Sequence, residues 1–212
     1  MNSVGGLVES SVIETAAAVL TAVGTVAVAI LAIWGDKLRA WLAGPKLALS
    51  LRDARGDLTT RADGRKTIYY HVAVSNDRSW SPAKAVRVLV VGVAKRRPDG
   101  TYYPEPVVAP LQLTWAFPQF HELFPTVVTS DTCDFGHLDE DAARFTLATY
   151  VTPNNFRGHV EAGQAMQVHL IASAHNVDRT KPLVLEVSWD GQWSSDMEEM
   201  KRHLVIKEVS AA

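Results

Sequence analysis

The densest group of side chains with chemical potential lies in the run DTCDFGHLDED, between residues 131 and 141. Oxygen ligands of this kind hold Ca²⁺ or Mg²⁺. The spacing matches no EF-hand loop, and acidic side chains are also typical of a solvated loop that opens a short helix. We expect such a loop and helix here, and metal-assisted catalysis is the alternative. The acidic and imidazole side chains concerned are Asp131, Asp134, His137, Asp139, Glu140 and Asp141.

The only cysteine of the chain, Cys133, lies inside this group. One cysteine forms no intramolecular disulfide, which fits a reducing compartment. A reactive thiol needs a neighbouring base or cation, and the sequence does not place one. We therefore expect Cys133 to be an inert, half-buried thiol.

A second group of side chains is typical of binding surfaces. It comes from the runs TYVTPNNF, residues 149–156, and WDGQW, residues 189–193. Tyr, Trp and Asn on loops bury a large area at small entropic cost. The amides equally suit a turn, and the indoles equally suit a core. The candidate binding surface for an unknown protein or small molecule consists of Tyr150, Asn154, Asn155, Phe156, Trp189 and Trp193.

Motifs of nucleotide, hydrolase and metal sites are missing from the sequence. There is no GxGxxG or Walker loop, no GxSxG elbow and no HExxH. We expect no catalytic residue, no cofactor and no metal. Of the 23 acidic residues only Glu9 and Glu14 precede Gly35, so as many acidic as basic residues follow it. A neutral domain gives no electrostatic reason to expect nucleic acid as a partner.

The first structural element predicted along the chain is an apolar segment, residues 15–35, which contains no charged residue. As a helix it spans about 30 Å, the hydrocarbon thickness of a bilayer. A cleaved signal peptide would need a basic start, and a buried core helix is rarely apolar on every face. We predict a short tail (residues 1–14), a transmembrane helix (15–35) and an interfacial helix or linker (36–45). The expected anchors at the membrane surface are Trp34, Lys37, Arg39 and Trp41.

The flanking charges predict the orientation of this helix. No basic residue precedes it, whereas Lys37, Arg39 and Lys46 follow it closely. The positive-inside rule therefore places the N-terminus outside and the downstream domain in the cytoplasm, at the cell membrane.

One face of the same helix carries small residues at four-residue spacing. Such a face lets two helix backbones approach closely in lipid. It predicts self-association, and the alternative is an ordinary lipid-facing surface. The residues concerned are Ala17, Thr21, Thr25 and Ala29.

After Pro45 the hydrophobic period changes from helical to two, which is typical of strands. Asp-Gly turns at residues 63–64, 99–100 and 190–191 separate extended runs. A capping box from Ser195 to Glu198 predicts one short helix, with Glu198 paired to Arg202. We therefore expect a mainly β domain, residues 46–212, built as an antiparallel β-sandwich of about nine strands, with a closed barrel as the alternative. The expected strands are Lys46–Arg52, Thr67–Asn76, Ala85–Lys95, Leu111–Trp115, Thr126–Cys133, Arg144–Val151, Ala165–Ala174, Leu183–Trp189 and Leu204–Val209.

One segment of this domain, Tyr69–Val93, has an apolar strand ending in Asn, a loop with a Pro-Ala step and a Val-rich strand. It resembles the core hairpin of bacterial immunoglobulin-like domains of the cell-adhesion-related (CARDB-like) kind. The resemblance implies a sandwich of seven or more strands with a binding or scaffolding role. Such domains are usually exported, whereas the positive-inside rule predicts a cytoplasmic domain here. We base the predicted location on the positive-inside rule. The matching positions are Asn76, Pro82, Ala83, Val86 and Val88.

Three functions remain open from the sequence. The first is a non-enzymatic, membrane-anchored module that binds a partner at the cytoplasmic face. The second is a membrane effector, in which the domain senses a ligand and clustered helices perturb the bilayer. The third is a metal-assisted enzyme that uses the acidic run.

Overall fold

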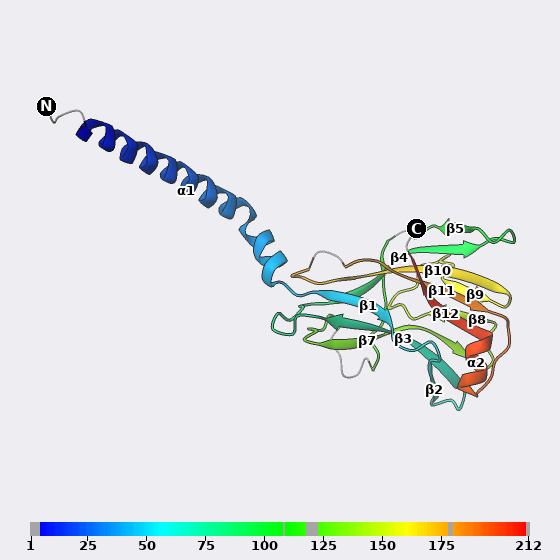
Figure 1. Cartoon of the computed structure of the whole chain (residues 1–212). Coiled ribbons are helices and arrows are strands. Elements are labelled where there is room, and N and C mark those ends of the chain that lie inside the picture. Colours follow the sequence, from blue (N-terminus) through cyan, green and yellow to red (C-terminus); the bar gives the residue numbers. More distant parts are fainter. Residues whose placement is uncertain (1–4, 108, 118–122, 178–179, 211–212) are drawn as a thin grey trace. The chain divides into compact units, whose positions relative to one another are not determined.

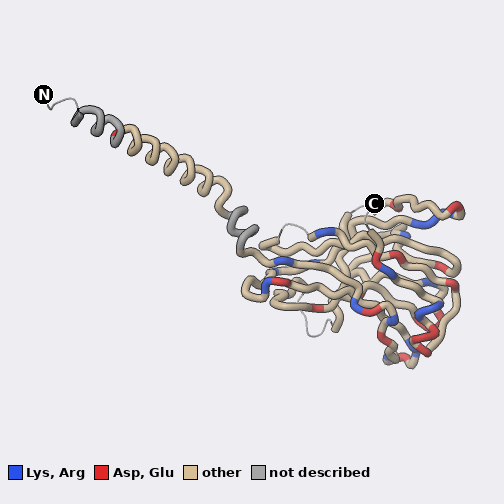
Figure 2. Tube along the Cα trace, viewed as in Figure 1, with Lys and Arg blue, Asp and Glu red and all other residues tan. Residues whose placement is uncertain are grey.

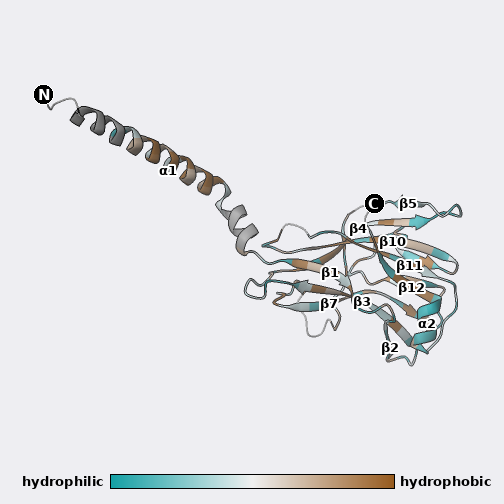
Figure 3. Ribbon diagram, in the orientation of Figure 1, coloured by the Kyte–Doolittle hydropathy of each residue, from teal (hydrophilic) through white to brown (hydrophobic). Residues whose placement is uncertain are grey.

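The apolar N-terminal stretch forms one continuous helix, α1 (Gly5–Ala43) (Figure 1). The computed structural model describes residues 5–107, 109–117, 123–177 and 180–210, without the side chains of 5–13 and 36–42. The stretch Glu14–Gly35 is long and apolar enough to cross a membrane, with a mean hydropathy of 2.5, and is largely brown in Figure 3. The helix extends past the predicted span on both sides. It ends before Pro45, because proline disfavours a helical conformation in the residue before it.

The second unit, Gly44–Ala212, contains two antiparallel sheets. The first has the order β1-β3-β7-β8-β9, with β2 also paired to β3; the second has the order β12-β11-β10-β4-β5, with β6 also paired to β4. The strands of the first sheet are β1 (Leu47–Leu51), β2 (Asp57–Thr60), β3 (Lys66–Asn76), β7 (Ser130–Asp139), β8 (Arg144–Leu147) and β9 (His159–Glu161). Those of the second are β4 (Arg87–Arg96), β5 (Tyr102–Glu105), β6 (Leu111–Gln112), β10 (Gln164–Ser173), β11 (Leu183–Trp189) and β12 (Leu204–Val209).

One apolar core joins the two sheets. Along β3 every second side chain is buried, and the same alternation recurs on β10. Tyr70 from β3 meets Phe145 from β8 edge-on, with ring centroids 5.9 Å apart, and both contribute to a core shared with Val90 and Leu170 of the second sheet. The sheets therefore form the two layers of a sandwich-like fold.

The described residues contain twelve strands, so the expected number of nine is wrong. The strands that were missed are β2, β5 and β9. All four residues of β2 are exposed, so they carry no apolar period. Pro104 lies within β5. A proline fits there because β5 is an edge strand of its sheet and does not need every backbone N–H for pairing. Strand β9 has only three residues.

The acidic run is a strand, β7, and the predicted loop and helix are wrong. Cys133, Phe135 and Leu138 point into the core, whereas Asp134 and Asp139 lie on the outer side. The pairing of β7 with its neighbour β3 shifts in register between Tyr70 and His71. This shift accompanies an interruption in the alternation of buried and partly exposed residues along β7. The density of acidic residues concealed a strand whose buried positions are apolar.

The turns follow the predicted Asp-Gly chemistry. Gly64 and Gly100 have φ angles of +86° and close the hairpins β2–β3 and β4–β5. Gly191, with φ of +98°, instead leads from β11 toward helix α2 (Met197–His203). The segment Tyr69–Val93 is not a hairpin, because β3 and β4 lie in different sheets.

Candidate functional site

A groove of about 810 Å³ lies between the hairpin β4–β5 and the segment α2–β12. We call it the basic groove. Its lining includes Ala165 on β10 and Ser188 on β11, which are register partners on adjacent strands. Their small side chains leave the space that longer side chains would fill. Apart from Tyr103, the charged and titratable side chains of its lining are Lys95, Arg96, Arg97, Asp190, Arg202 and His203.

The β4–β5 hairpin positions the first arginines. Arg96 is the last residue of β4, and the Arg97 N–H donates to the Thr101 carbonyl at 2.8 Å. The Asp99 carboxylate accepts from the Thr101 N–H at 2.8 Å, which fixes the turn. The Arg97 guanidinium lies over the ring of Tyr103, 5.0 Å from its centroid. This stacking holds a cation at the groove.

Helix α2 supplies the opposite side of the groove. Its N-cap is Asp196, whose carboxylate accepts from the N–H groups of Glu198 and Glu199. The N-cap therefore lies one residue after the predicted Ser195, and the Asp196 N–H donates to the Ser194 hydroxyl at 3.1 Å, so the reciprocal bond of a capping box is not made. Glu198 pairs with Arg55 at 3.2 Å, and the predicted pair with Arg202 does not form. Arg202 lies in the last helical turn, where the helix dipole favours a cation.

The single carboxylate of the groove is engaged by its neighbour. The Nδ1 atom of His203 lies 2.8 Å from Oδ2 of Asp190, and the Gln192 N–H donates to Oδ1 at 2.9 Å. Partial burial opposes ionisation, but these hydrogen bonds lower the pKa of Asp190 below its usual range. Asp190 thus orients His203. Because its carboxylate oxygens are already engaged in these hydrogen bonds, it repels a bound anion less strongly than a free carboxylate would.

The groove therefore concentrates positive charge on a domain that is neutral as a whole. Four cations face one carboxylate, and within the described residues no carboxylate forms an ion pair with Arg96, Arg97 or Arg202. Burial lowers the pKa of Lys95, although Glu105 and Glu161 oppose the shift. Guanidinium groups match the geometry of phosphate and carboxylate oxygens. This arrangement suits an anionic ligand.

The outer face of the first sheet holds a second arrangement of titratable groups. Nε2 of His71 lies 3.1 Å from Oδ2 of Asp57, and its Nδ1 lies 2.9 Å from Oδ1 of Asp134. These contacts connect β2, β3 and β7. A groove of about 690 Å³ in the same sheet is lined by two carboxylates, one guanidinium and one imidazole. With two carboxylates and one guanidinium, this groove offers no excess of positive charge to an anion.

The predicted binding surface is not brought together as one site. Trp189 is buried in the core, 5% exposed, and its indole N–H donates to the Gln192 carbonyl at 2.9 Å. Trp193 and Phe156 pack against the same core. Asn155 takes a φ of +68°, as expected of a turn residue, next to Asn154 in the same turn. Tyr150 is exposed and lies on the loop after β8.

The predicted small-residue face of α1 is built as follows. The Thr21 hydroxyl donates to the Ala17 carbonyl at 2.8 Å, and the Thr25 hydroxyl donates to the Thr21 carbonyl at 2.9 Å. Ala29 is exposed on the helix. Both threonine hydroxyls thus donate to backbone carbonyls of their own helix. Self-association through this face remains a prediction.

Of the predicted membrane anchors, the structure describes one side chain. Trp34 is exposed at the end of the apolar stretch. The side chains of Lys37, Arg39 and Trp41 lie outside the described residues. Their anchoring role stays a prediction.

The acidic run and its cysteine have different environments from those expected. Cys133 is fully buried rather than half-buried, and burial, with the charges of Asp131 and Asp134, raises the pKa of its thiol well above the usual value. In the described parts of the chain, no three His, Cys, Asp or Glu side chains are grouped so that they could hold a metal ion. The carboxylates of the run are spread along β7 and the turn that follows it.

Comparison of the chain with protein-family models, curated proteins and solved structures finds no match. Of the predicted binding surface, Trp189 lines the basic groove, whereas sequence reasoning missed the cations of the groove. Their signals were two short basic runs, residues 95–97 before a turn and residues 201–203 at a helix end.

Proposed function

We propose that the chain is a single-pass membrane protein whose sandwich-like domain binds an anionic ligand in the basic groove, at the cytoplasmic face of the cell membrane, without catalysing a reaction. The observation that carries this proposal is the excess of unpaired cations around one hollow. An unpaired cationic site costs free energy through self-repulsion, which a bound anion relieves.

The membrane anchoring rests on the apolar stretch Glu14–Gly35. No Lys or Arg lies within it (Figure 2), whereas Lys37, Arg39 and Lys46 follow it. This asymmetry supports the cytoplasmic orientation of the domain. A tethered domain would hold its ligand, or a partner that carries the anionic group, close to the membrane.

The resemblance to immunoglobulin-like domains also supports a binding role. The order β11-β10-β4-β5 corresponds to the order G-F-C-C′ of such sandwiches, and Tyr69–Val93 passes from one sheet to the other as strands B and C do. The first sheet departs from that pattern, because β8 follows its neighbour β7 in the chain, whereas strand D precedes strand E.

Titration of the full-length protein with pyrophosphate tests the groove. We expect heat of binding in calorimetry and a rise in Tm, both of which weaken with salt. Arg96→Glu or Arg202→Glu is expected to lower the affinity by about 10-fold or more, since a charge-assisted hydrogen bond is lost. Lys201→Glu is the matched control for Arg202→Glu. It makes the same reversal of charge on the same helix, one residue away, but Lys201 does not line the groove. The proposal fails if the wild-type protein binds no pyrophosphate, or if all three variants behave alike.

The membrane effector is a second candidate, favoured by the internal hydrogen bonds of Thr21 and Thr25. With their hydroxyls satisfied, these threonines present methyl groups on a narrow helix face, which suits close packing against a second helix. Strong expression should then depolarise the host membrane, and the double variant Ala17→Leu, Thr21→Leu should abolish this effect. An unchanged membrane potential on expression of the wild-type protein counts against this candidate.

A further inference from the structure

We propose that the end of the β-domain at which the chain arrives from α1 docks onto the surface of the lipid bilayer through exposed aromatic side chains. This inference rests on the membrane anchoring proposed above. We call this surface the tethered end. It consists of residues 44–46, 77–87, 116–117, 123–131 and 180–182.

Hydrogen bonds fasten the loop after β3 to the start of the domain. The Arg78 guanidinium donates to the Gly44 carbonyl at 3.0 Å, and the Asp77 N–H donates to the Lys46 carbonyl at 3.0 Å. A second loop is joined to this one by the β-bridge between Ala83 and Val127. The loops that carry the aromatic residues therefore lie beside the point at which the chain enters the domain.

Five large apolar side chains of the tethered end are exposed to solvent. Trp80 is 73% exposed, on the loop after β3, and Phe117 is 64% exposed. Leu123, Phe124 and Val128 also remain exposed. Clustered apolar side chains on a protein surface mark a contact with a partner, and indole rings in particular favour the membrane interface.

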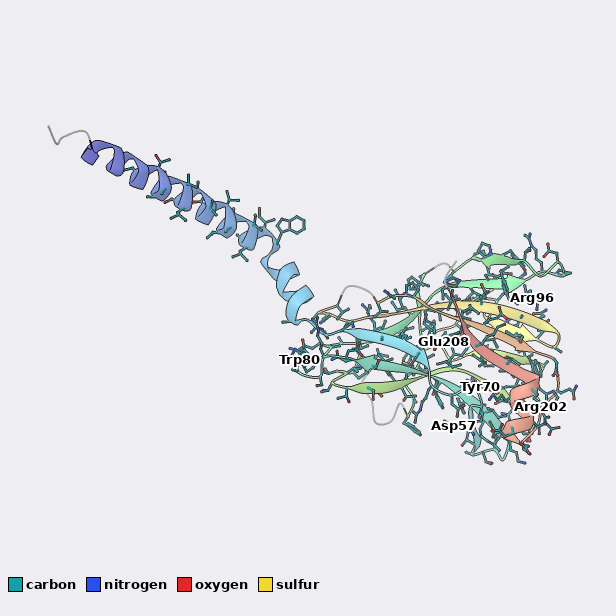
Figure 4. The ribbon with its side chains drawn as sticks, in the orientation of Figure 1. Asp57, Tyr70, Trp80, Arg96, Arg202 and Glu208 are labelled. Atoms are coloured by element: carbon teal, nitrogen blue, oxygen red, sulfur yellow. The ribbon has the colours of Figure 1, made fainter. Side chains whose placement is uncertain are left out.

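The charge of this surface complements an anionic leaflet. Its described residues include five basic side chains and two acidic ones, and the Arg87 guanidinium lies over the ring of Phe124, 5.8 Å from its centroid. Each basic side chain near an anionic membrane surface contributes about 1 kcal/mol. Figure 4 shows Trp80 at one end of the domain and Arg96 and Arg202 toward the other. Aromatic loops and the basic groove thus occupy different ends of the domain.

The short connection between the two units favours the bilayer as the occupant. Between Gly35 and Ala43 the chain is helical and extends about 12 Å, at 1.5 Å per residue. From Ala43 to Leu47 it reaches at most about 14 Å. The tethered end therefore remains within a few tens of ångströms of the membrane, where its effective concentration is high.

Fluorescence quenching in full-length protein tests this docking. The variant Ser79→Cys, next to Trp80, is labelled with a nitrobenzoxadiazole group and placed in nanodiscs of phosphatidylcholine and phosphatidylserine that contain a shallow doxyl-labelled lipid. The matched control is Ala62→Cys, an exposed residue at the tip of the β2–β3 hairpin, at the other end of β3. Cys133 is fully buried, so it takes no label in the folded protein.

We expect quenching at residue 79 to exceed that at residue 62 at least 3-fold, and Trp80→Ala to remove most of the difference. Equal quenching at both positions in protein that has entered the discs overturns the docking and leaves the anchor intact. Protein that does not enter the discs overturns the anchor, and the docking with it.

Discussion

At the residue scale, His137 shows how burial changes the chemistry of one side chain. Its imidazole packs against the ring of Tyr69, with centroids 5.6 Å apart, and its buried Nδ1 has no hydrogen-bond partner within the described residues. Desolvation lowers the pKa of this imidazole below its ordinary value of 6.5, although Asp139 opposes the shift. The folded protein therefore keeps His137 neutral under conditions in which the unfolded chain takes up a proton.

This difference predicts how stability depends on pH. Below about pH 6.5 the unfolded state binds more protons at this site than the folded state, so the free energy of unfolding falls as the pH drops toward the lowered folded-state pKa. His137→Gln should flatten this fall between about pH 7 and pH 5 in urea titrations. The exposed His175 offers the control, since His175→Gln should retain the wild-type slope. Parallel curves for wild type and His137→Gln would contradict the prediction.

At the element scale, α2 shows how a cap determines where a functional side chain lies. Asp196 satisfies the N–H groups of Glu198 and Glu199 at 2.8 and 3.2 Å. Its position as N-cap starts the helix at Met197 and thereby brings Arg202 and His203 to the last turn, beside the basic groove. If the helix began at the same place in the fold but one residue earlier in the chain, these side chains would be turned by about 100° around its axis.

We predict that Asp196→Ala lowers the free energy of unfolding by about 1 kcal/mol, because it leaves two amide groups of the first turn without their acceptor. Ser195→Ala should change it by less than about 0.5 kcal/mol, since Ser195 is exposed and does not cap the helix. Chemical denaturation of both variants measures the difference. A larger loss for Ser195→Ala would instead place the cap on Ser195, as the sequence had indicated.

At the scale of the whole molecule, the sandwich-like domain separates an aromatic end from a basic groove. We propose different partners for the two surfaces, a bilayer for the tethered end and an anionic ligand for the groove. Strand β4 connects these regions, since it runs from Arg87 at the tethered end to Lys95 and Arg96 at the groove. The core also buries Cys133, so the native thiol cannot report on which side of the membrane the domain lies.

The orientation of the domain is therefore best tested with Ala62→Cys, whose position is exposed. We expect a membrane-impermeant maleimide to label this variant only after spheroplasts are lysed, because the positive-inside rule places the domain in the cytoplasm. The wild-type protein, treated alike, should gain label only after denaturation. Labelling of residue 62 in intact spheroplasts would reverse the predicted orientation.

The sequence by itself determined the features that depend on local pattern. The apolar stretch Glu14–Gly35 and the alternation in β3, β10 and β11 are visible along the chain, because helix and strand impose their own periods on buried residues. The Asp-Gly turns were visible because few residues accept a positive φ. Strands without this pattern, such as β2 and β9, were not.

Only the tertiary structure decided how distant segments combine. Residues 95–97 and 202–203 lie in two separate, short basic runs of the sequence. They form a site because the pairing of β10 with β4 and β11 brings them to one groove. The same holds for Trp189, whose burial depends on the stacking of two sheets. Charge and burial are properties of neighbours in space, and strand order, which local sequence does not specify, chooses those neighbours.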